Sequence, residues 1–223
     1  MVYIRNRRKR ELIPKKMWIP LMFTMLCNVA VYNGSRLLTT NLVHYDLSGR
    51  LEEGIPFVPC SIILYLGCYI FWIANYIIGC RREKETAYRF MSADLAAKLV
   101  CLEFFLFFPT TNVRPDIPGS SVWDEAMRAL YRIDAADNLF PSIHCLTSSF
   151  CVIAVWNNKE VPKWYQIASV LIAFSVCIST LTTKQHVLMD VFGGVLLAAG
   201  SWLFVEKSGL ARWYQSVLGG DGA

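Results

Sequence analysis

The pair of residues in this chain best suited to chemistry is His186 and Asp190, which lie four positions apart. On a helix this spacing places both side chains on one face. A carboxylate beside an imidazole fixes which ring nitrogen carries the proton and stabilises the protonated ring, as a nucleophilic or basic histidine requires. The spacing alone leaves a second interpretation open, a structural ion pair near the end of a membrane helix.

A second polar cluster, residues 138–145, places Ser142 and His144 directly after Pro141. Proline is accepted in the first turn of a helix, where its missing N–H would have no partner. The sequence therefore predicts a helix that begins at Pro141 and carries Ser142 and His144 in its first turn. His186 is predicted in the first turn of a later helix. Free backbone amides and the positive end of the helix dipole favour an anion at such positions.

Two cations complete the candidate site, since Arg114 follows a long apolar segment and Lys184 lies two residues before His186. The chain has three histidines in all, and two of them belong to this set. Two helix N-termini, two histidines and two cations on one face would form a cage for phosphate. No cluster of Asp and Glu suggests a metal site, so we expect metal-independent activity without a cofactor.

Composition shows what must position these residues. Of the 223 residues, 55% are hydrophobic and only 17% are charged, whereas charged residues make up about a quarter of a soluble domain. The apolar residues come in long blocks, which is typical of membrane helices. We expect an all-α fold, a single integral-membrane domain. The eight cysteines show no CxxC spacing and are expected to be free thiols.

Six apolar segments are predicted to cross the membrane, at residues 17–35, 57–80, 86–109, 141–157, 164–183 and 185–205. Basic residues crowd residues 1–16 and follow the second segment at 81–84, which predicts cytoplasmic N- and C-termini. A membrane anchor at 1–16 is favoured over a nucleic-acid-binding arm because an apolar segment follows at once. The predicted organisation is a basic cytoplasmic segment at 1–16, a six-helix catalytic domain at 17–206 and a short cytoplasmic tail at 207–223.

This topology brings Arg114, residues 138–144 and residues 184–190 to one side of the cell membrane, the extracytoplasmic face. Within the third segment, Asp94 and Lys98 are spaced to form an ion pair. Residues 122–132 have the spacing of an amphipathic surface helix. Three acidic residues of the polar segment 110–140 are expected to be solvated loop charges: Asp116, Asp134 and Asp137.

Three stretches of the chain resemble signatures of the type 2 phosphatidic acid phosphatase superfamily over roughly residues 57–205. Pro141-Ser-Ile-His144 resembles the second signature, P-S-x-H. Residues 179–190 resemble the third, S-R-x5-H-x3-D, with Ser179, His186 and Asp190 in register. Residues 113–115, Val-Arg-Pro, resemble the end of the first, K-x6-R-P. The chain departs from the pattern at Phe107, where the first-motif lysine would fall, and at Thr180, where the third-motif arginine would fall.

The resemblance implies an enzyme that hydrolyses a lipid phosphate, such as phosphatidate, phosphatidylglycerol phosphate or a polyprenyl phosphate. It implies that His186 attacks phosphorus and forms a phosphohistidine, that Asp190 orients the ring, and that His144 protonates the leaving alcohol. The residues implied to hold the phosphate oxygens are Arg114, Ser142 and Lys184.

Two other interpretations stay open. The weakened first motif and the stretch Thr183-Lys-Gln-His186 are similar to the branch containing inositol-phosphorylceramide synthases. That similarity implies a transferase that passes a phospho-headgroup to a lipid hydroxyl, as in sphingomyelin synthesis. The two missing basic residues also permit an inactive protein that only binds lipid. In every case the expected partners are the membrane and a lipid, and no nucleic acid.

Overall fold

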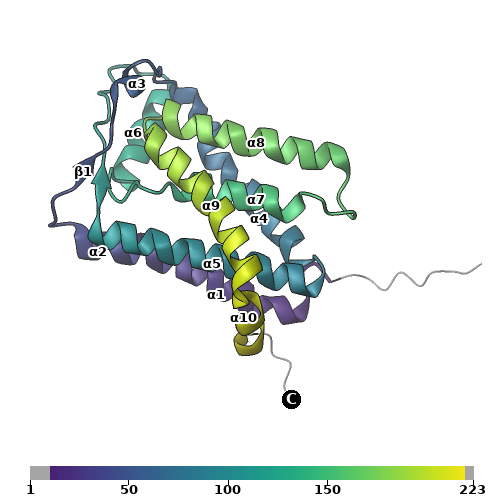
Figure 1. The fold of residues 1–223 in the computed structure, drawn as a ribbon. Helices are drawn as coiled ribbons and strands as arrows, with labels where there is room; N and C mark the ends of the chain where they lie inside the picture. The colour runs from purple at the N-terminus through teal and green to yellow at the C-terminus, as the bar shows by residue number, and fades with distance from the viewer. Residues whose placement is uncertain (1–10, 219–223) are drawn as a thin grey trace, which may run out of the picture.

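The computed structural model describes residues 11–218, which are mostly helical (Figure 1). The long helices are α1 (Trp18–Val29), which runs through a π-helical turn (Ala30–Gly34) into α2 (Ser35–Thr39), then α4 (Ile62–Cys80), α5 (Lys84–Phe107), α6 (Val122–Ile133), α7 (Ile143–Val155), α8 (Lys163–Thr182), α9 (Leu188–Ser208) and α10 (Leu210–Leu218). Short elements are 3-10 turns at Lys15–Met17 and Pro59–Ser61, α3 (Arg50–Glu53), and a parallel pairing of β1 (Tyr45–Asp46) with β2 (Thr110–Thr111).

Each of the six apolar segments predicted from sequence coincides with a helix, and the surface helix predicted at 122–132 is α6. Three helices of the described chain are long and apolar enough to cross a membrane: Pro59–Cys80, Lys163–Thr182 and Leu188–Ser208. The helix Ile143–Val155 is apolar but shorter. Helix α10 was not predicted; it lies in the expected tail, of which residues 219–223 are outside the described residues, as are residues 1–10 of the basic segment.

Helix α7 lies at the centre of the bundle and packs against α4, α8 and α9 (Figure 1). Its buried side chains are small or apolar, which allows close packing on several sides. The approach of α9 to the start of α7 depends on Gly194, because a Cβ there would lie 2.5 Å from the carbonyl oxygen of Ser142. This glycine therefore brings together the two helix starts that carry the predicted site.

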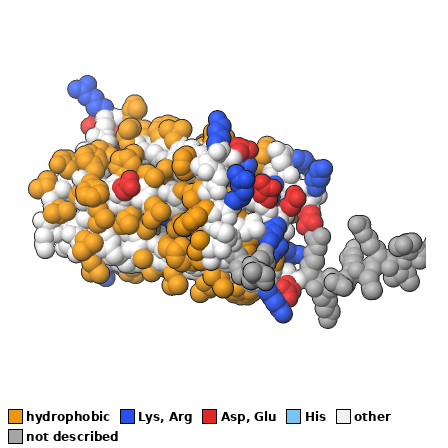
Figure 2. Space-filling view, turned by 60° about the horizontal axis from the view of Figure 1, so that its bottom comes forward, with side chains coloured by type: hydrophobic (Ala, Val, Ile, Leu, Met, Phe, Trp, Pro, Cys, Tyr) orange, Lys and Arg blue, Asp and Glu red, His pale blue; other side chains and the backbone are white. Residues whose placement is uncertain are grey.

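The outer surface of the bundle is apolar, unlike that of a soluble protein. Large hydrophobic side chains are exposed along the long apolar helices, with Ile70 at 76% and Leu196 at 68%. Figure 2 shows a face covered mostly by hydrophobic side chains, with most of its Lys, Arg, Asp and Glu side chains toward one end. Exposed apolar surface of this extent is typical of contact with lipid.

Lys98 and Asp94 form an ion pair that is buried inside the bundle. The Lys98 ammonium lies 2.5 Å from Oδ1 of Asp94, with side-chain exposures of 3% and 0%. The pairing confirms the sequence prediction, and pairing is what makes two charges tolerable at such depth.

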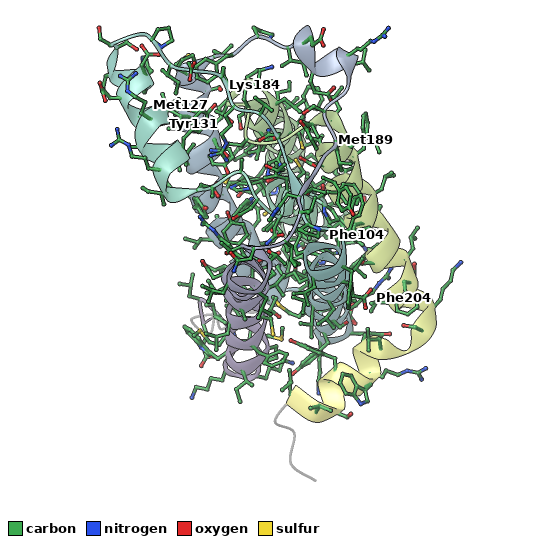
Figure 3. The ribbon with its side chains drawn as sticks, turned by 90° about the vertical axis from the view of Figure 1, so that its left-hand side faces the viewer. Phe104, Met127, Tyr131, Lys184, Met189 and Phe204 are labelled. Atoms are coloured by element: carbon green, nitrogen blue, oxygen red, sulfur yellow. The ribbon has the colours of Figure 1, made fainter. Side chains whose placement is uncertain are left out.

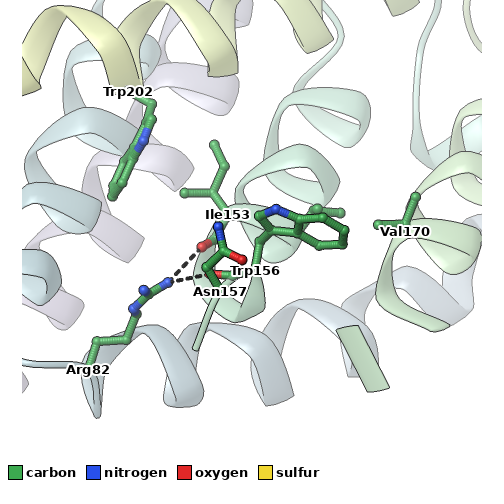
Figure 4. Close-up of a pocket in the computed structure, with 7 residues that line it drawn as sticks. Arg82, Ile153, Trp156, Asn157, Val170 and Trp202 are labelled. Atoms are coloured by element: carbon green, nitrogen blue, oxygen red, sulfur yellow. Dashed lines mark hydrogen bonds between the residues drawn. The ribbon is translucent and has the colours of Figure 1, made fainter. Parts of the chain in front are cut away.

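The C-terminal end of α7 is held by Arg82 at the α4–α5 turn. Its NH1 group donates to the carbonyl oxygens of Ile153 (3.1 Å), Ala154 (3.3 Å) and Trp156 (3.1 Å). These carbonyls lack partners within the helix, so a guanidinium satisfies them well. Trp156 and Trp202 line a hollow of about 510 Å³ beside Arg82 (Figure 4). Tryptophan and arginine together are typical of a membrane interface.

Candidate active site

His186 and Asp190 form the predicted pair at the start of α9. Oδ2 of Asp190 lies 3.1 Å from Nδ1 of His186 and accepts the backbone N–H of Val187 at 3.0 Å. The helix begins at Leu188, so the prediction that His186 lies in its first turn is wrong. Val187 has an extended backbone and caps the helix, while Asp190 in the first turn reaches back to the chain before it.

The pairing decides which nitrogen of His186 is free to react. Because the carboxylate accepts at Nδ1, that nitrogen carries the proton and Nε2 keeps its lone pair. Nε2 makes no hydrogen bond within residues 11–218, and the residue is 9% exposed. Asp190 is fully buried, and its Oδ1 has no partner in the same part of the chain. A carboxylate in this position stabilises positive charge that develops on the ring.

Ser142 and His144 lie at the start of α7, as the sequence predicts, but the helix begins later than expected. Ser142 is the N-cap, and its Oγ accepts the N–H of Cys145 at 3.4 Å. The predicted start at Pro141 is therefore wrong, because a serine that accepts an amide of the first turn is a better cap. His144 lies in the first turn. The N–H of Ser142 also donates to the carbonyl of Asp190 at 3.0 Å, which joins the two helix starts.

The ring of His144 is held by aromatic side chains of α4. It stacks on Tyr65 with centroids 4.3 Å apart and lies 5.3 Å from the ring of Trp72. Its Nε2 is buried and has no hydrogen-bond partner in the described chain. The ring centroid lies 6.0 Å from that of His186. The two predicted histidines therefore lie next to one another, with their rings tilted by 58°.

A cavity of about 630 Å³ opens beside the two histidines, enclosed by α1, α4, α6 and the segments before α7 and α9. This volume is in the range of sites that take a whole small molecule. The polar side chains that line it beyond His144 and His186 are Asn28, Tyr32, Asn33, Arg36, Tyr65, Tyr69, Asp134, Asp137, Asn138 and Gln185.

Arg114 approaches this site through Gln185. Its guanidinium donates to the side-chain Oε1 of Gln185 and to the carbonyl of Asp134, and it lies 4.6 Å above the ring of Tyr131. Burial lowers the pKa of Arg114, which the nearby Asp134 opposes. Arg114 lines a second hollow of about 650 Å³, which His186 also lines, rather than the cavity beside His144.

Lys184 lies at the same end of the molecule, near Tyr131 in Figure 3. Its ammonium donates to the carbonyl oxygens of Glu52 (3.0 Å) and Ile55 (2.6 Å). Lys184 lines the second hollow together with Arg114 and His186, and is not among the residues of the cavity beside His144. The structure thus brings Ser142, His144, His186 and Asp190 together and directs Lys184 to backbone carbonyls. Its contact with phosphate stays a prediction.

Two acidic residues that are predicted to be solvated loop charges instead make contacts with side chains of the protein. Asp134 is half-buried and accepts hydrogen bonds from the hydroxyls of Tyr32 and, at 2.8 Å, Tyr65. Asp137 pairs with Arg36 at 3.0 Å. The prediction is wrong for Asp134 and Asp137, because their partners come from helices far away in the sequence. Asp116 is exposed, as predicted. Across residues 11–218 no three His, Cys, Asp or Glu side chains cluster as metal ligands would.

The chain matches the sequence model of a known protein family. The sequence model of the PAP2 superfamily matches residues 57–204, more than half of the chain, and this range contains both histidines, Asp190 and Arg114. Searches among curated proteins and among solved structures found no match. With two thirds of its length covered by that match, the chain belongs to the PAP2 superfamily.

Proposed function

We propose that the protein is a membrane lipid phosphatase that hydrolyses a phosphomonoester or diphosphate of a lipid through a phosphohistidine. The candidate substrates are phosphatidate, phosphatidylglycerol phosphate and polyprenyl phosphates. The observation that carries the proposal is the geometry of His186, whose Nδ1 is fixed by Asp190 while Nε2 is left free beside His144. Membership of the PAP2 superfamily supports phosphatase or phosphotransferase chemistry.

In the first half-reaction the Nε2 lone pair of His186 attacks phosphorus. The N–P bond forms as the bond from phosphorus to the lipid oxygen breaks, and the leaving oxygen takes the electron pair and a proton from His144. Asp190 balances the positive charge on the substituted imidazole. In this proposal the developing negative charge on phosphate is met by the amides at the start of α7 and by Ser142 and Lys184, while Arg114 acts on it through Gln185.

In the second half-reaction water attacks the phosphohistidine. The new O–P bond forms as the N–P bond breaks, and His144 accepts the proton that water loses. Phosphate then leaves, and the histidines return to their starting states. Each proton and charge in this sequence is handled by a group of the chain, so the proposal requires no cofactor.

The proposal includes a topology in which all six apolar segments cross the cell membrane, with both termini in the cytoplasm and the site on the extracytoplasmic face. Its support is the distribution of cations. The cations at the end of the bundle opposite the histidines are Arg81 and Arg82 in the α4–α5 turn, Lys84 at the start of α5, Lys159 before α8 and Lys163 at the start of α8. An excess of lysine and arginine marks cytoplasmic loops.

The size of the cavity favours a second candidate, a transferase that passes a phospho-headgroup to a lipid hydroxyl. A volume of about 630 Å³ with many polar side chains beyond the histidines has room for a headgroup as well as a phosphate. The first half-reaction is the same, and a lipid hydroxyl replaces water in the second.

Product analysis separates the two candidates. Purified protein in lipid vesicles is given a panel of lipid phosphates and headgroup-labelled phospholipids, with a chelator present. Release of inorganic phosphate supports the phosphatase, and label on a second lipid supports the transferase. Neither product from any lipid, or equal product from a His186→Ala control, contradicts both.

A further inference from the structure

One residue that lines the cavity beside the two histidines has a buried side-chain amide without a hydrogen-bond partner in the described chain. Gln185 is 1% exposed, and its Nε2 has no hydrogen-bond partner within the described residues. The same side chain lines the cavity together with His144 and His186. A buried amide N–H without a partner is costly, so such a group in a cavity indicates a ligand that accepts from it.

The orientation of this amide is set by Arg114. A guanidinium only donates, so the group of Gln185 that faces it must be the oxygen. The NH₂ group is then turned away from Arg114. Arg114 itself is fixed by the carbonyl of Asp134 and by the ring of Tyr131.

The backbone that carries Gln185 is also fixed. The N–H groups of Gln185 and His186 both donate to the carbonyl of Thr180, at 3.0 and 3.1 Å. Tyr131 donates its hydroxyl to the carbonyl of Thr183 at 2.7 Å, and Asn112 donates to the carbonyl of Lys184 at 3.0 Å. A donor held this firmly needs no reorganisation when charge develops beside it.

We propose that Nε2 of Gln185 donates to a non-bridging oxygen of the phosphoryl group that His186 attacks, and that Arg114 is a positioning residue that acts through Gln185. The inference rests on the proposed function and adds a phosphate contact that the three signatures do not contain. Thr180, at the position of the motif arginine, offers no such donor. It is fully buried, and its hydroxyl donates to the carbonyl of Cys177 at 2.7 Å.

The test is Gln185→Glu in the full-length protein. The glutamate still accepts from Arg114, but it presents an acceptor in place of the donor toward phosphate. We expect kcat to fall by about 10²–10³-fold, as for loss of one preorganised donor, with weaker inhibition by orthovanadate and little change in Tm. If Gln185→Glu does not fold, Gln185→Met, which is of similar length and lacks a donor, is measured in its place.

Gln166→Glu is the matched control. Gln166 is another buried glutamine, but both of its Nε2 hydrogens already donate to carbonyls, those of Asn158 (3.1 Å) and Val161 (2.9 Å). Its replacement is expected to lower Tm and to leave orthovanadate inhibition unchanged. Made alone, Arg114→Lys is expected to reduce activity. Added to Gln185→Glu, it is expected to reduce activity much less, because the effects of substitutions at coupled residues do not add.

The outcomes distinguish this inference from the proposed function. An active wild type together with wild-type kcat and orthovanadate inhibition in Gln185→Glu overturns the inference alone. Independent, multiplying losses from Arg114→Lys and Gln185→Glu overturn the positioning role of Arg114. A wild-type protein that is inactive on every lipid phosphate and binds no orthovanadate overturns the proposed function and the inference with it.

Discussion

Oδ2 of Asp190 lies 3.1 Å from Nδ1 of His186 and 3.0 Å from the backbone nitrogen of Val187. The same carboxylate oxygen therefore accepts the backbone N–H at the start of α9 and keeps the proton of the candidate nucleophile, His186, on Nδ1. A change at this position affects helix stability and chemistry, and two substitutions separate the effects.

Asp190→Asn is expected to lower phosphate release by about 10²–10⁴-fold, because an amide no longer stabilises positive charge on the ring. Its side-chain oxygen still accepts from Val187, so Tm is expected to change little. Asp190→Ala also removes the side-chain acceptor of the Val187 N–H at the start of α9 and is expected to cost about 1 kcal/mol in the free energy of unfolding. Activity and Tm measured together in detergent check both statements, and a fully active Asp190→Asn variant would refute them.

The spacing of four residues was enough to predict the contact between His186 and Asp190, because both a helical face and a helix cap bring such residues together. It was not enough to predict which of the two geometries occurs. The role of Asp134 could not be predicted, since its donors, Tyr32 and Tyr65, lie on α1's π-helical extension and on α4. Gln185 was missed for the same reason, because its significance comes from a tertiary contact with Arg114.

The helices themselves were predictable because apolar runs of membrane length leave few alternatives. The residues at which these helices begin and end were less predictable. The start of α7 moved from Pro141 to Ile143 because Ser142 acts as the cap. Helix α10 is short and amphipathic, and its burial depends on packing against α5 that no local pattern reveals.

His144→Ala is expected to slow hydrolysis of a lipid phosphate by about 10²–10⁴-fold, the usual contribution of a general acid. An aryl phosphate such as p-nitrophenyl phosphate has a leaving group that needs no proton. His144→Ala is therefore expected to slow the first half-reaction with this substrate much less. A rapid-mixing measurement of the p-nitrophenol burst checks this. Equal losses for both substrates would exclude His144 as the acid.

Gly194→Ala is expected to destabilise the protein by about 1–3 kcal/mol, the usual cost of overpacking. The new methyl group would lie 2.5 Å from the carbonyl oxygen of Ser142 and 3.0 Å from the nitrogen of Leu146. Separation of α7 from α9 is also expected to reduce activity, since it parts the two histidines.

Gly200 on the same helix gives the matched control, because a Cβ there meets nothing within 4 Å. Gly200→Ala is expected to be neutral or to stabilise the helix by about 0.5–1 kcal/mol. Thermal unfolding of the two variants side by side checks the prediction. Similar Tm values for both would show that the close approach of α7 and α9 is not required.

Tyr65→Phe is expected to keep the stack on His144 and to lose the hydrogen bond to Asp134. Loss of a hydrogen bond to a charged group costs about 1.5–3 kcal/mol in the free energy of unfolding. Tm is therefore expected to fall while orthovanadate inhibition stays close to that of the wild type. Inhibition that weakens as much as in the Gln185→Glu variant would instead place the Tyr65 hydroxyl in contact with phosphate.

The most direct test of the account is to trap the covalent intermediate. The protein is mixed with a ³²P-labelled lipid phosphate, quenched with base and separated under denaturing conditions. We predict label on the wild-type protein that is stable to base and lost in acid, as a phosphohistidine is, and located by peptide analysis at His186. The His186→Ala variant is predicted to carry none. Label that persists in His186→Ala, or hydrolysis by the wild type with no trapped label at any quench time, would contradict the assignment of His186 as the nucleophile.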